Sequence, residues 1–344
     1  MADQYKNIRA YRVGWLLAIT DWLTILPVLK WFERKTTTSV KLAYLGDRKQ
    51  IEQDIKHGAC FLTNHRDICM DSAWLSMLLR MRYFIRPYIG IGNNLFAKWW
   101  IEPVVRFLRC FVVIRNGSLH EQVENAKTLS RYINDLRRRG KSIWLAQREG
   151  RAKDSNDLTQ PGVLKMLTFD APDFFEAVKA LNICPVSITY EYDPCDYLKA
   201  QEFQMKRDNP AYKKSKQDDL QNMKVGILGR KGHIHYEAAP CINTWLDELS
   251  ELPRTELFAE IARRMDKQIH AGYRLYPGNY VAADLLTGGK DYSSHYTHAQ
   301  KEAFEEYLKG RIALVQVENK DEGFLRERLL TMYANPVFNK HKAI

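Results

Sequence analysis

Short apolar runs alternate with helix-like stretches from residue 59 onward, and this alternation restricts the chain to few folds. Six short runs predict buried strands at residues 59–63, 84–91, 111–115, 142–147, 185–192 and 233–237. Helix-like stretches occur between them at residues 72–81, 94–108, 119–139 and 172–181. Such alternation usually produces a largely parallel sheet with helices on both faces, so we predict an α/β fold.

The composition is that of a folded chain with anionic partners. The 344 residues are 45% hydrophobic and 27% charged, which is enough to bury a core and excludes a disordered chain. The net charge of +11 favours phospholipid surfaces, phosphorylated metabolites or nucleic acid. We expect no nucleic-acid partner, because the sequence has no recognition helix, zinc signature or aromatic RNA-binding motif. The six scattered cysteines favour free thiols in a reducing compartment.

Residues 13–32 form a nearly continuous apolar segment that contains Asp21 and Pro27. On a helix its few polar side chains share one narrow sector, and basic residues lie on both flanks. The length suffices to span a bilayer, but Asp21 and Pro27 argue against a spanning helix, and no signal-peptide cleavage site follows. We predict an amphipathic membrane helix that lies in the interface. The alternative is an ordinary core helix.

The chain divides by pattern into three parts. Residues 1–45 are expected to form an N-terminal membrane-associating helical segment, and residues 46–240 the α/β domain. Residues 241–344 are expected to form a helical C-terminal extension, with helices at 254–272, 298–310 and 322–333 and no recognisable chemical motif. Within the α/β domain, the basic segment 206–217 is expected to be a solvated loop, and the alternative is a contact with lipid or an acidic carrier protein.

The strongest chemical signal is the segment TNHRDICMDSAWLSMLL at residues 63–79. A predicted strand ends here, and His65 occupies the turn before an apolar helix. Asp67 is a suitable N-cap, and Asp71 lies one turn further on, where it can point back at the turn. A histidine with a carboxylate in reach suits general-base catalysis, because the carboxylate orients the ring and stabilises the imidazolium. The alternative is a histidine that only satisfies hydrogen bonds of the turn.

This segment resembles motif I of the glycerol-phosphate acyltransferase superfamily, which includes the 1-acylglycerol-3-phosphate acyltransferases. The family motif is N-H-x-S-x-x-D, with the aspartate five positions after the histidine. Here Met70 occupies that position, and the carboxylates of Asp67 and Asp71 lie two and six positions after His65. The resemblance therefore implies that His65 is catalytic and leaves both aspartates as candidates for its partner.

Further resemblances follow in the order of the family. FVVIR (111–115) resembles the second motif, which implies that Arg115 binds the acceptor phosphate. QREGRAKDS (147–155) is similar to the third motif, E-G-T-R-S, so Glu149, Gly150 and Arg151 are implied substrate-binding residues. CPVSITYE (184–191) resembles the fourth motif, and HIHYEAAP (233–240) the strand that closes the domain. Glu149 either positions the acceptor or pairs with a neighbouring arginine.

The resemblance implies an O-acyltransferase that moves a fatty acyl group from acyl-CoA or acyl carrier protein to glycerol 3-phosphate or 1-acylglycerol 3-phosphate in phospholipid synthesis. It implies no cofactor beyond the thioester co-substrate and no metal. With the N-terminal segment, it predicts an anionic phospholipid membrane as partner, and a monotopic protein on the cytoplasmic face of a bacterial inner membrane. The alternatives are an acyltransferase for a different lysolipid or hydroxyl acceptor, and a non-catalytic basic membrane-binding protein.

Two other chemical readings of the sequence are weaker. Cys69 suggests a covalent acyl-enzyme, but no second histidine lies nearby to activate it, and direct transfer needs no nucleophilic side chain. His233 and His235 share a strand face, yet no third metal ligand is close in the sequence, so strand packing is the preferred interpretation.

Overall fold

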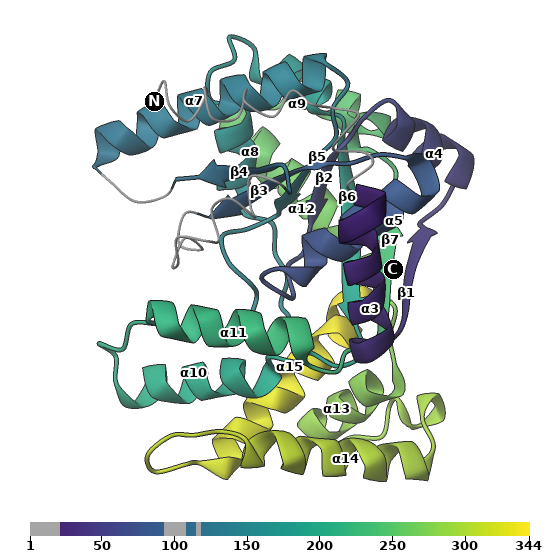
Figure 1. The fold of residues 1–344 in the computed structure, drawn as a ribbon, viewed down its shortest axis with the longest axis vertical. Coiled ribbons are helices and arrows are strands. Elements are labelled where there is room, and N and C mark those ends of the chain that lie inside the picture. The colour runs from purple at the N-terminus through teal and green to yellow at the C-terminus, as the bar shows by residue number, and fades with distance from the viewer. Residues whose placement is uncertain (1–20, 93–107, 115–117) are drawn as a thin grey trace.

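The computed structural model describes residues 21–92, 108–114 and 118–344, and a seven-stranded sheet forms the centre of this part (Figure 1). The strands are β1 (Thr37–Tyr44), β2 (Cys60–Thr63), β3 (Tyr88–Gly92), β4 (Cys110–Val113), β5 (Ile143–Ala146), β6 (Ile183–Tyr190) and β7 (Gly232–Ala238). Their order is β1-β7-β6-β2-β5-β3-β4. Neighbouring strands are parallel except β6 and β7, which are antiparallel. The predicted α/β fold with a largely parallel sheet is confirmed.

All six predicted strands are present, but β1 was not predicted. Residues 37–44 were assigned to the helical N-terminal segment, and that assignment is wrong because they pair with β7. None of the eight residues of β1 is buried, since the strand lies at the edge of the sheet. A half-exposed edge strand needs no continuous apolar run, which explains why its sequence gave no strand signal.

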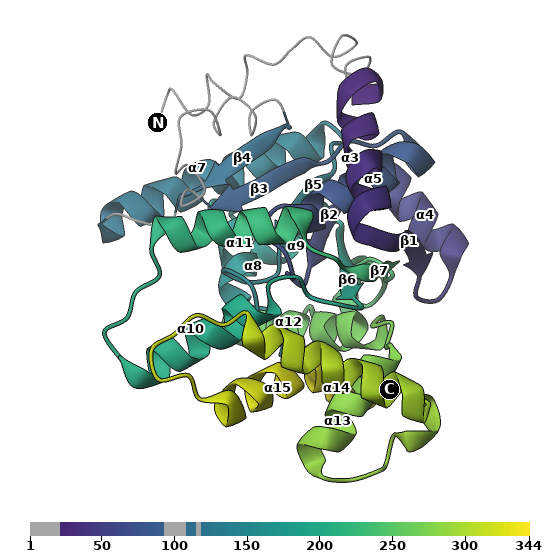
Figure 2. The ribbon, with the colours of Figure 1, turned by 60° about the horizontal axis from the view of Figure 1, so that its bottom comes forward.

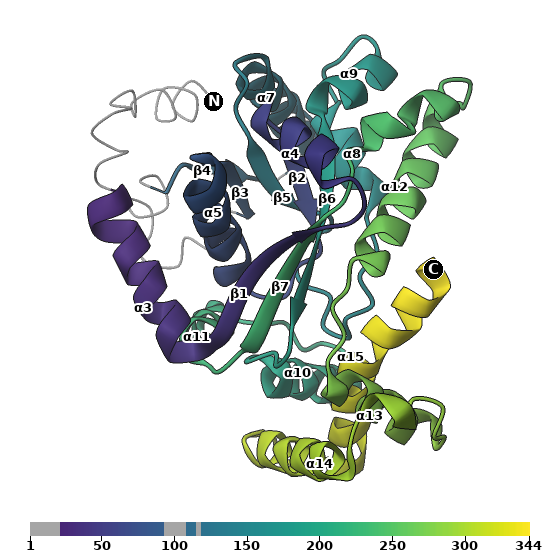
Figure 3. The same ribbon diagram turned by 90° about the vertical axis from the view of Figure 1, so that its right-hand side faces the viewer.

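Helices cover both faces of the sheet (Figure 3). On one face lie α3 (Leu26–Thr36), α4 (Arg48–Lys56) and α5 (Met70–Tyr83). On the other lie α7 (Leu119–Arg138), α8 (Pro161–Leu167), α9 (Phe174–Leu181) and α12 (Arg254–Ala271). Each face has its own apolar core, with Leu75 of α5 in one and Ile133 of α7 and Phe258 of α12 in the other. β2 lies between the two cores, with Leu62 in one and Phe61 in the other.

A second group of helices gathers at one end of the molecule (Figures 1 and 2). These are α10 (Asp196–Asp208), α11 (Lys216–Leu228), α13 (Pro277–Thr287), α14 (His298–Ala313) and α15 (Glu322–Ala343). α10 and α13–α15 share a third apolar core, which includes Phe304 and Leu329. The buried carboxylate of Asp196 on α10 joins them further, because Arg311 of α14 pairs with it at 2.5 Å.

Most predicted helices are confirmed, including three of the C-terminal part, which correspond to α12, α14 and α15. The predicted helix 94–108 lies almost wholly outside the described residues. The predicted loop 206–217 is wrong at both ends, because only residues 209–215 connect α10 to α11. Neither helix was predicted. α10 buries Lys199 and Glu202, so its inward face does not show an apolar period.

The predicted membrane segment 13–32 is described only from residue 21. Residues Asp21–Ile25 form a π-helical turn that leads into α3. Along this stretch Leu23, Val28 and Trp31 are exposed, whereas Leu26 packs into the core. Within the described residues no helix combines the length and apolarity needed to cross a bilayer. The amphipathic interfacial helix stays a prediction.

Candidate active site

The central strand β2 ends at Thr63, and the turn that follows carries His65. β2 lies between β5 and β6, and its carboxyl end opens at the edge of the sheet where ligands of α/β proteins bind. The side chain of Asn64 fixes the start of the turn. Its Oδ1 accepts the Ile188 N–H at 2.7 Å, and its Nδ2 donates to the Ile188 carbonyl at 2.9 Å, so the turn is tied to β6.

The imidazole of His65 is held by Asp71. Nδ1 of His65 lies 2.8 Å from Oδ2 of Asp71, a carboxylate with no exposed surface. The same oxygen accepts the backbone N–H groups of Arg66 (2.6 Å) and Asp67 (3.0 Å). Asp71 lies in the first turn of α5, where the helix amino terminus favours negative charge. The carboxylate therefore fixes Nδ1 as the protonated nitrogen and leaves Nε2 available to a substrate.

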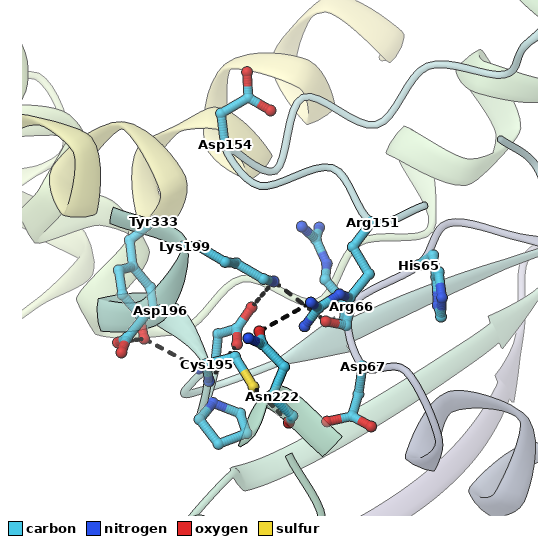
Figure 4. Close-up of polar contacts among 12 residues, drawn as sticks. His65, Arg66, Asp67, Arg151, Asp154, Cys195, Asp196, Lys199, Asn222 and Tyr333 are labelled. Atoms are coloured by element: carbon cyan, nitrogen blue, oxygen red, sulfur yellow. Dashed lines mark hydrogen bonds and ion pairs between the residues drawn. The ribbon is translucent and has the colours of Figure 1, made fainter. Parts of the chain in front are cut away.

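Asp67 has a different function in the same turn. Its Oδ1 accepts the N–H groups of Cys69 (2.9 Å) and Met70 (2.8 Å), which places it at the start of α5 as a cap. Figure 4 shows its carboxylate directed away from His65. Burial, followed by the nearby charge of Asp71, raises the pKa of Asp67. Of the two aspartates that the sequence left open, Asp71 is the one in contact with the histidine.

His65 opens into a cavity of about 610 Å³ at the carboxyl edge of the sheet. Gly90 and Ile91 of β3, Val113 of β4 and Trp144 of β5 contribute to its wall. The loop after β5 supplies the predicted residues Glu149, Gly150 and Arg151, together with Arg148. β4 also ends at this cavity, since Ile114 lines it. Arg115, the next residue, lies outside the described residues.

The two arginines of this loop have buried donors without partners. Arg151 donates from Nη2 to Oδ1 of Asn222 on α11 at 2.9 Å, as Figure 4 shows. Its Nη1 and the Nε of Arg148 are buried without a hydrogen-bond partner among the described residues. Unpaired buried donors of this kind are costly, and an anion bound in the cavity would satisfy them.

Residues 44–189 match the family model described as Acyltransferase. These residues are an acyltransferase domain. The family is that of the 1-acylglycerol-3-phosphate acyltransferases, which confirms the resemblance seen in the sequence. The match includes β2–β6, the His65–Asp71 pair and the arginine loop, and it ends before α10. A search of curated proteins found no match to the chain.

Two lysines that were not predicted as site residues also line this cavity of the acyltransferase domain. Lys153 lines it and pairs with Glu202 of α10, and burial lowers the pKa of Lys153 to about 8. Lys214 lines it from the loop before α11 and pairs with Asp219. Only the basic composition of segment 206–217 could have indicated Lys214, because it lies beyond the matched family and in no motif.

An apolar cavity of about 190 Å³ adjoins the first one. Its walls come from α3, α5 and β3 of the acyltransferase domain and its flanks, and include Leu29, Met77 and Ile89. Ile68 and Ile91 line both cavities, so the two meet beside the turn that carries His65. The arrangement places a polar, cationic space at His65 and an apolar space beside the turn that carries it.

The structure also places the two weaker sequence candidates, Cys69 and the pair of His233 and His235. Cys69 lines the apolar cavity, and burial strongly raises the pKa of its thiol, which disfavours a thiolate nucleophile. On β7, Nδ1 of His233 lies 2.9 Å from the Ser39 hydroxyl, and Nε2 of His235 lies 2.8 Å from a carboxylate oxygen of Glu237. Both histidines thus have partners on the paired strands β1 and β7.

Proposed function

We propose that this protein transfers a fatty acyl group from a thioester donor, acyl-CoA or acyl carrier protein, to a hydroxyl of glycerol 3-phosphate or 1-acylglycerol 3-phosphate in phospholipid synthesis. One observation carries the proposal: within an acyltransferase domain, His65 is paired with Asp71 and faces a cationic cavity, and the turn that carries it also borders an apolar one. The anionic phosphate of the acceptor suits the cationic cavity, and the apolar acyl chain of the donor suits the apolar cavity.

In the proposed mechanism Nε2 of His65 is the general base. It removes the proton of the acceptor hydroxyl as the oxygen attacks the thioester carbonyl carbon. Asp71 accepts the hydrogen bond of Nδ1–H and stabilises the imidazolium that forms. The tetrahedral intermediate then loses the thiolate, which takes the proton from Nε2. An ester and a free thiol are the products, and no covalent acyl-enzyme is formed.

The turn around His65 offers the amide of Ile68 for the oxyanion. The N–H groups of Arg66 and Asp67 donate to Asp71, and those of Cys69 and Met70 donate to Asp67. Among the described residues, the N–H of Ile68 has no hydrogen-bond partner. Ile68 lines both cavities, so it lies beside the space proposed for the thioester. We assign this N–H to the developing oxyanion.

The acceptor phosphate is assigned to the cationic side of the first cavity. Arg148 and Arg151 would bind it with their unpaired buried donors, and Lys153 would add a further charge. Arg115, at the end of β4, is expected to contribute as the family resemblance implies. The acyl chain is assigned to the apolar cavity between α3 and α5.

The surface beside the apolar cavity supports membrane association. Leu23 and Trp31 of the N-terminal helical stretch are 72% and 54% exposed, and Phe84 at the end of α5 is 69% exposed. Basic residues lie on the same elements, among them Arg34 and Arg82. A lipid surface would cover the apolar groups and attract the basic ones, so a monotopic position on the cytoplasmic face of a bacterial inner membrane is proposed.

A thiol-release assay tests this function. The protein is incubated with acyl-CoA or acyl carrier protein and with lysophosphatidate, glycerol 3-phosphate or unphosphorylated hydroxyl compounds. Release that depends on lysophosphatidate or glycerol 3-phosphate is the expected result. Release only with a different lysolipid or hydroxyl acceptor would support acyl transfer but assign a different acceptor to the protein. No release with any pair would support a non-catalytic basic membrane-binding protein instead.

A further inference from the structure

Both sequence neighbours of His65 are bound by one buried carboxylate. Nδ2 of Asn64 donates to Oδ2 of Asp157 at 3.2 Å, and Nη2 of Arg66 contacts the same oxygen at 2.7 Å. Asp157 has no exposed surface, Asn64 has none, and Arg66 is 5% exposed. Since His65 lies between them, its backbone is held on both sides by Asp157, which comes from the loop after β5.

Asp157 is in turn held by the end of α12. The hydroxyl of Tyr273 donates to the same Oδ2 at 2.6 Å, and Nε2 of His270 lies 2.6 Å from the Asp157 carbonyl oxygen. The ring of Tyr273 also supports the guanidinium of Arg66, which lies 5.7 Å from its centroid. Two residues further along the loop, Thr159 donates from N and Oγ1 to Asp266 of α12. α12 therefore contacts the loop that carries Asp157, and Tyr273, two residues after the end of α12, contacts the carboxylate.

These contacts involve a part of the chain that no catalytic motif covers. The family match ends at residue 189, whereas Asp266, His270 and Tyr273 lie well beyond it. The groups that contact Asp157 are buried, and the contact of Asp157 with Arg66 is a charge-assisted ion pair. Burial and the charge of Asp157 raise the pKa of Tyr273 far above its usual value, so the hydroxyl stays a hydrogen-bond donor.

We infer that Asp157 and Tyr273 are positioning residues, through which the C-terminal helix α12 sets the place of the general base His65. The inference rests on the proposed function, and it gives residues 254–273 a task in the reaction. Asp71 fixes the tautomer and rotation of the imidazole, whereas Asp157 fixes the backbone from which the ring projects. A displacement of about 1 Å at a reacting group is enough to cost roughly a hundredfold in rate.

The test uses Tyr273→Phe, which removes one hydroxyl and keeps the ring that supports Arg66. We expect kcat to fall about tenfold, with the KM of donor and acceptor little changed. Tyr296→Phe is the matched control, because Tyr296 donates to Oδ2 of buried Asp284 at 2.7 Å in the same C-terminal part of the chain. The control lacks any contact with the turn of His65 and should keep its kcat.

The decisive measurement repeats Tyr273→Phe in a His65→Ala background. If Tyr273 acts through His65, its loss should cost nothing further there, since the two act as a unit. A tenfold loss that persists in this background would overturn the inference, as would an unchanged kcat in Tyr273→Phe or an equal loss in Tyr296→Phe. The proposed function fails by a different result, namely absent acyl transfer by the wild-type chain or full activity of His65→Ala.

Discussion

Asp71 follows His65 by six positions, and its Oδ2 nevertheless lies 2.8 Å from the imidazole Nδ1. The extra residue relative to the family spacing is absorbed in the turn, where residues 66–69 precede the first residue of α5. Three donors converge on Oδ2, two of them backbone N–H groups of that turn. The aspartate thus lies one position further along the sequence than in the family motif, but it still contacts the histidine.

His65→Ala is expected to lower kcat by about 10²–10⁴-fold, because it removes the general base. The side chain is partly exposed to the cavity and contributes little to the core, so the variant should stay folded. Thiol release is measured under saturating donor and acceptor, and circular dichroism confirms the fold. A folded His65→Ala protein that turns over at a near-normal rate would show that the mechanism is wrong.

Asp71→Asn and Asp67→Asn should differ sharply. Asp71→Asn removes the charge that stabilises the imidazolium, so its loss in kcat should approach that of His65→Ala and add little to it in the double variant. Asp67→Asn should cost about 1 kcal/mol of stability or less, because an amide oxygen can still cap α5, and it should largely spare turnover. Equal losses from the two variants would mean that the hydrogen-bond pattern does not reflect their roles.

The acceptor KM should increase as the pH rises through about 8. Burial lowers the pKa of Lys153 to about 8, so its charge is lost there while the acceptor phosphate stays a dianion. Loss of a charge-assisted contact of about 1.5–3 kcal/mol corresponds to roughly a tenfold or larger change in KM. Lys153→Arg stays charged at this pH and should keep the acceptor KM constant between pH 7 and 9.

The pH dependence of the free energy of unfolding distinguishes the change in acceptor KM from unfolding of the protein. A lysine whose folded-state pKa lies below the unfolded value of 10.5 binds fewer protons in the folded state. Its contribution to the free energy of unfolding therefore increases with pH between about 8 and 10.5. A melting temperature that drops in step with the KM increase would argue against Lys153 as the titrating group.

Cys69→Ala should retain most of the activity. The thiol of Cys69 is half-buried in the wall of the apolar cavity, and its raised pKa leaves almost no thiolate at neutral pH. The substitution removes a small apolar group from the wall of that cavity, so the KM of long-chain donors is the constant that should move. A loss as large as that of His65→Ala, or an acyl thioester trapped on Cys69, would favour a covalent intermediate.

The sequence allowed prediction of those parts of the molecule that depend on local pattern. The buried strands have continuous apolar runs, and the turn at His65 combines a strand end with a helix cap, so both could be located. β1 could not, because an edge strand without buried residues has no apolar run. The antiparallel junction of β6 and β7 could not either, since strand direction depends on how the long α10–α11 connection returns.

The candidate site was only partly predictable for a related reason. His65, Glu149, Gly150 and Arg151 could be chosen because each lies in a motif next to a strand end. The choice between Asp67 and Asp71 required the hydrogen bonds of the turn. Tyr273 lies more than 200 residues from His65 in the chain, and no local pattern relates them. Asp157, which connects them, is one of several acidic residues in a polar loop.

The helices α3 and α5 pack against each other. Binding to anionic vesicles should depend on the apolar side chains that are exposed on and next to these two helices. Trp31 is 54% exposed and Phe84 is 69% exposed. Insertion of a large apolar side chain is worth about 1.5–3 kcal/mol, so Trp31→Ser with Phe84→Asn should weaken vesicle binding by about tenfold or more. Asparagine is chosen because Phe84 has the left-handed backbone conformation, with φ of 60°.

Leu314→Ser is the control for this pair of substitutions. Leu314 is 50% exposed, but it follows α14, which belongs to a different apolar core from α3 and α5. If α3 and α5 face the membrane, Leu314→Ser should bind vesicles of anionic phospholipid as the wild type does. Binding to these vesicles should also weaken with added salt, because basic residues on α3 and α5 contribute attraction. Unchanged cosedimentation of the Trp31/Phe84 variant would mean that another surface, or residues 1–20, makes the membrane contact.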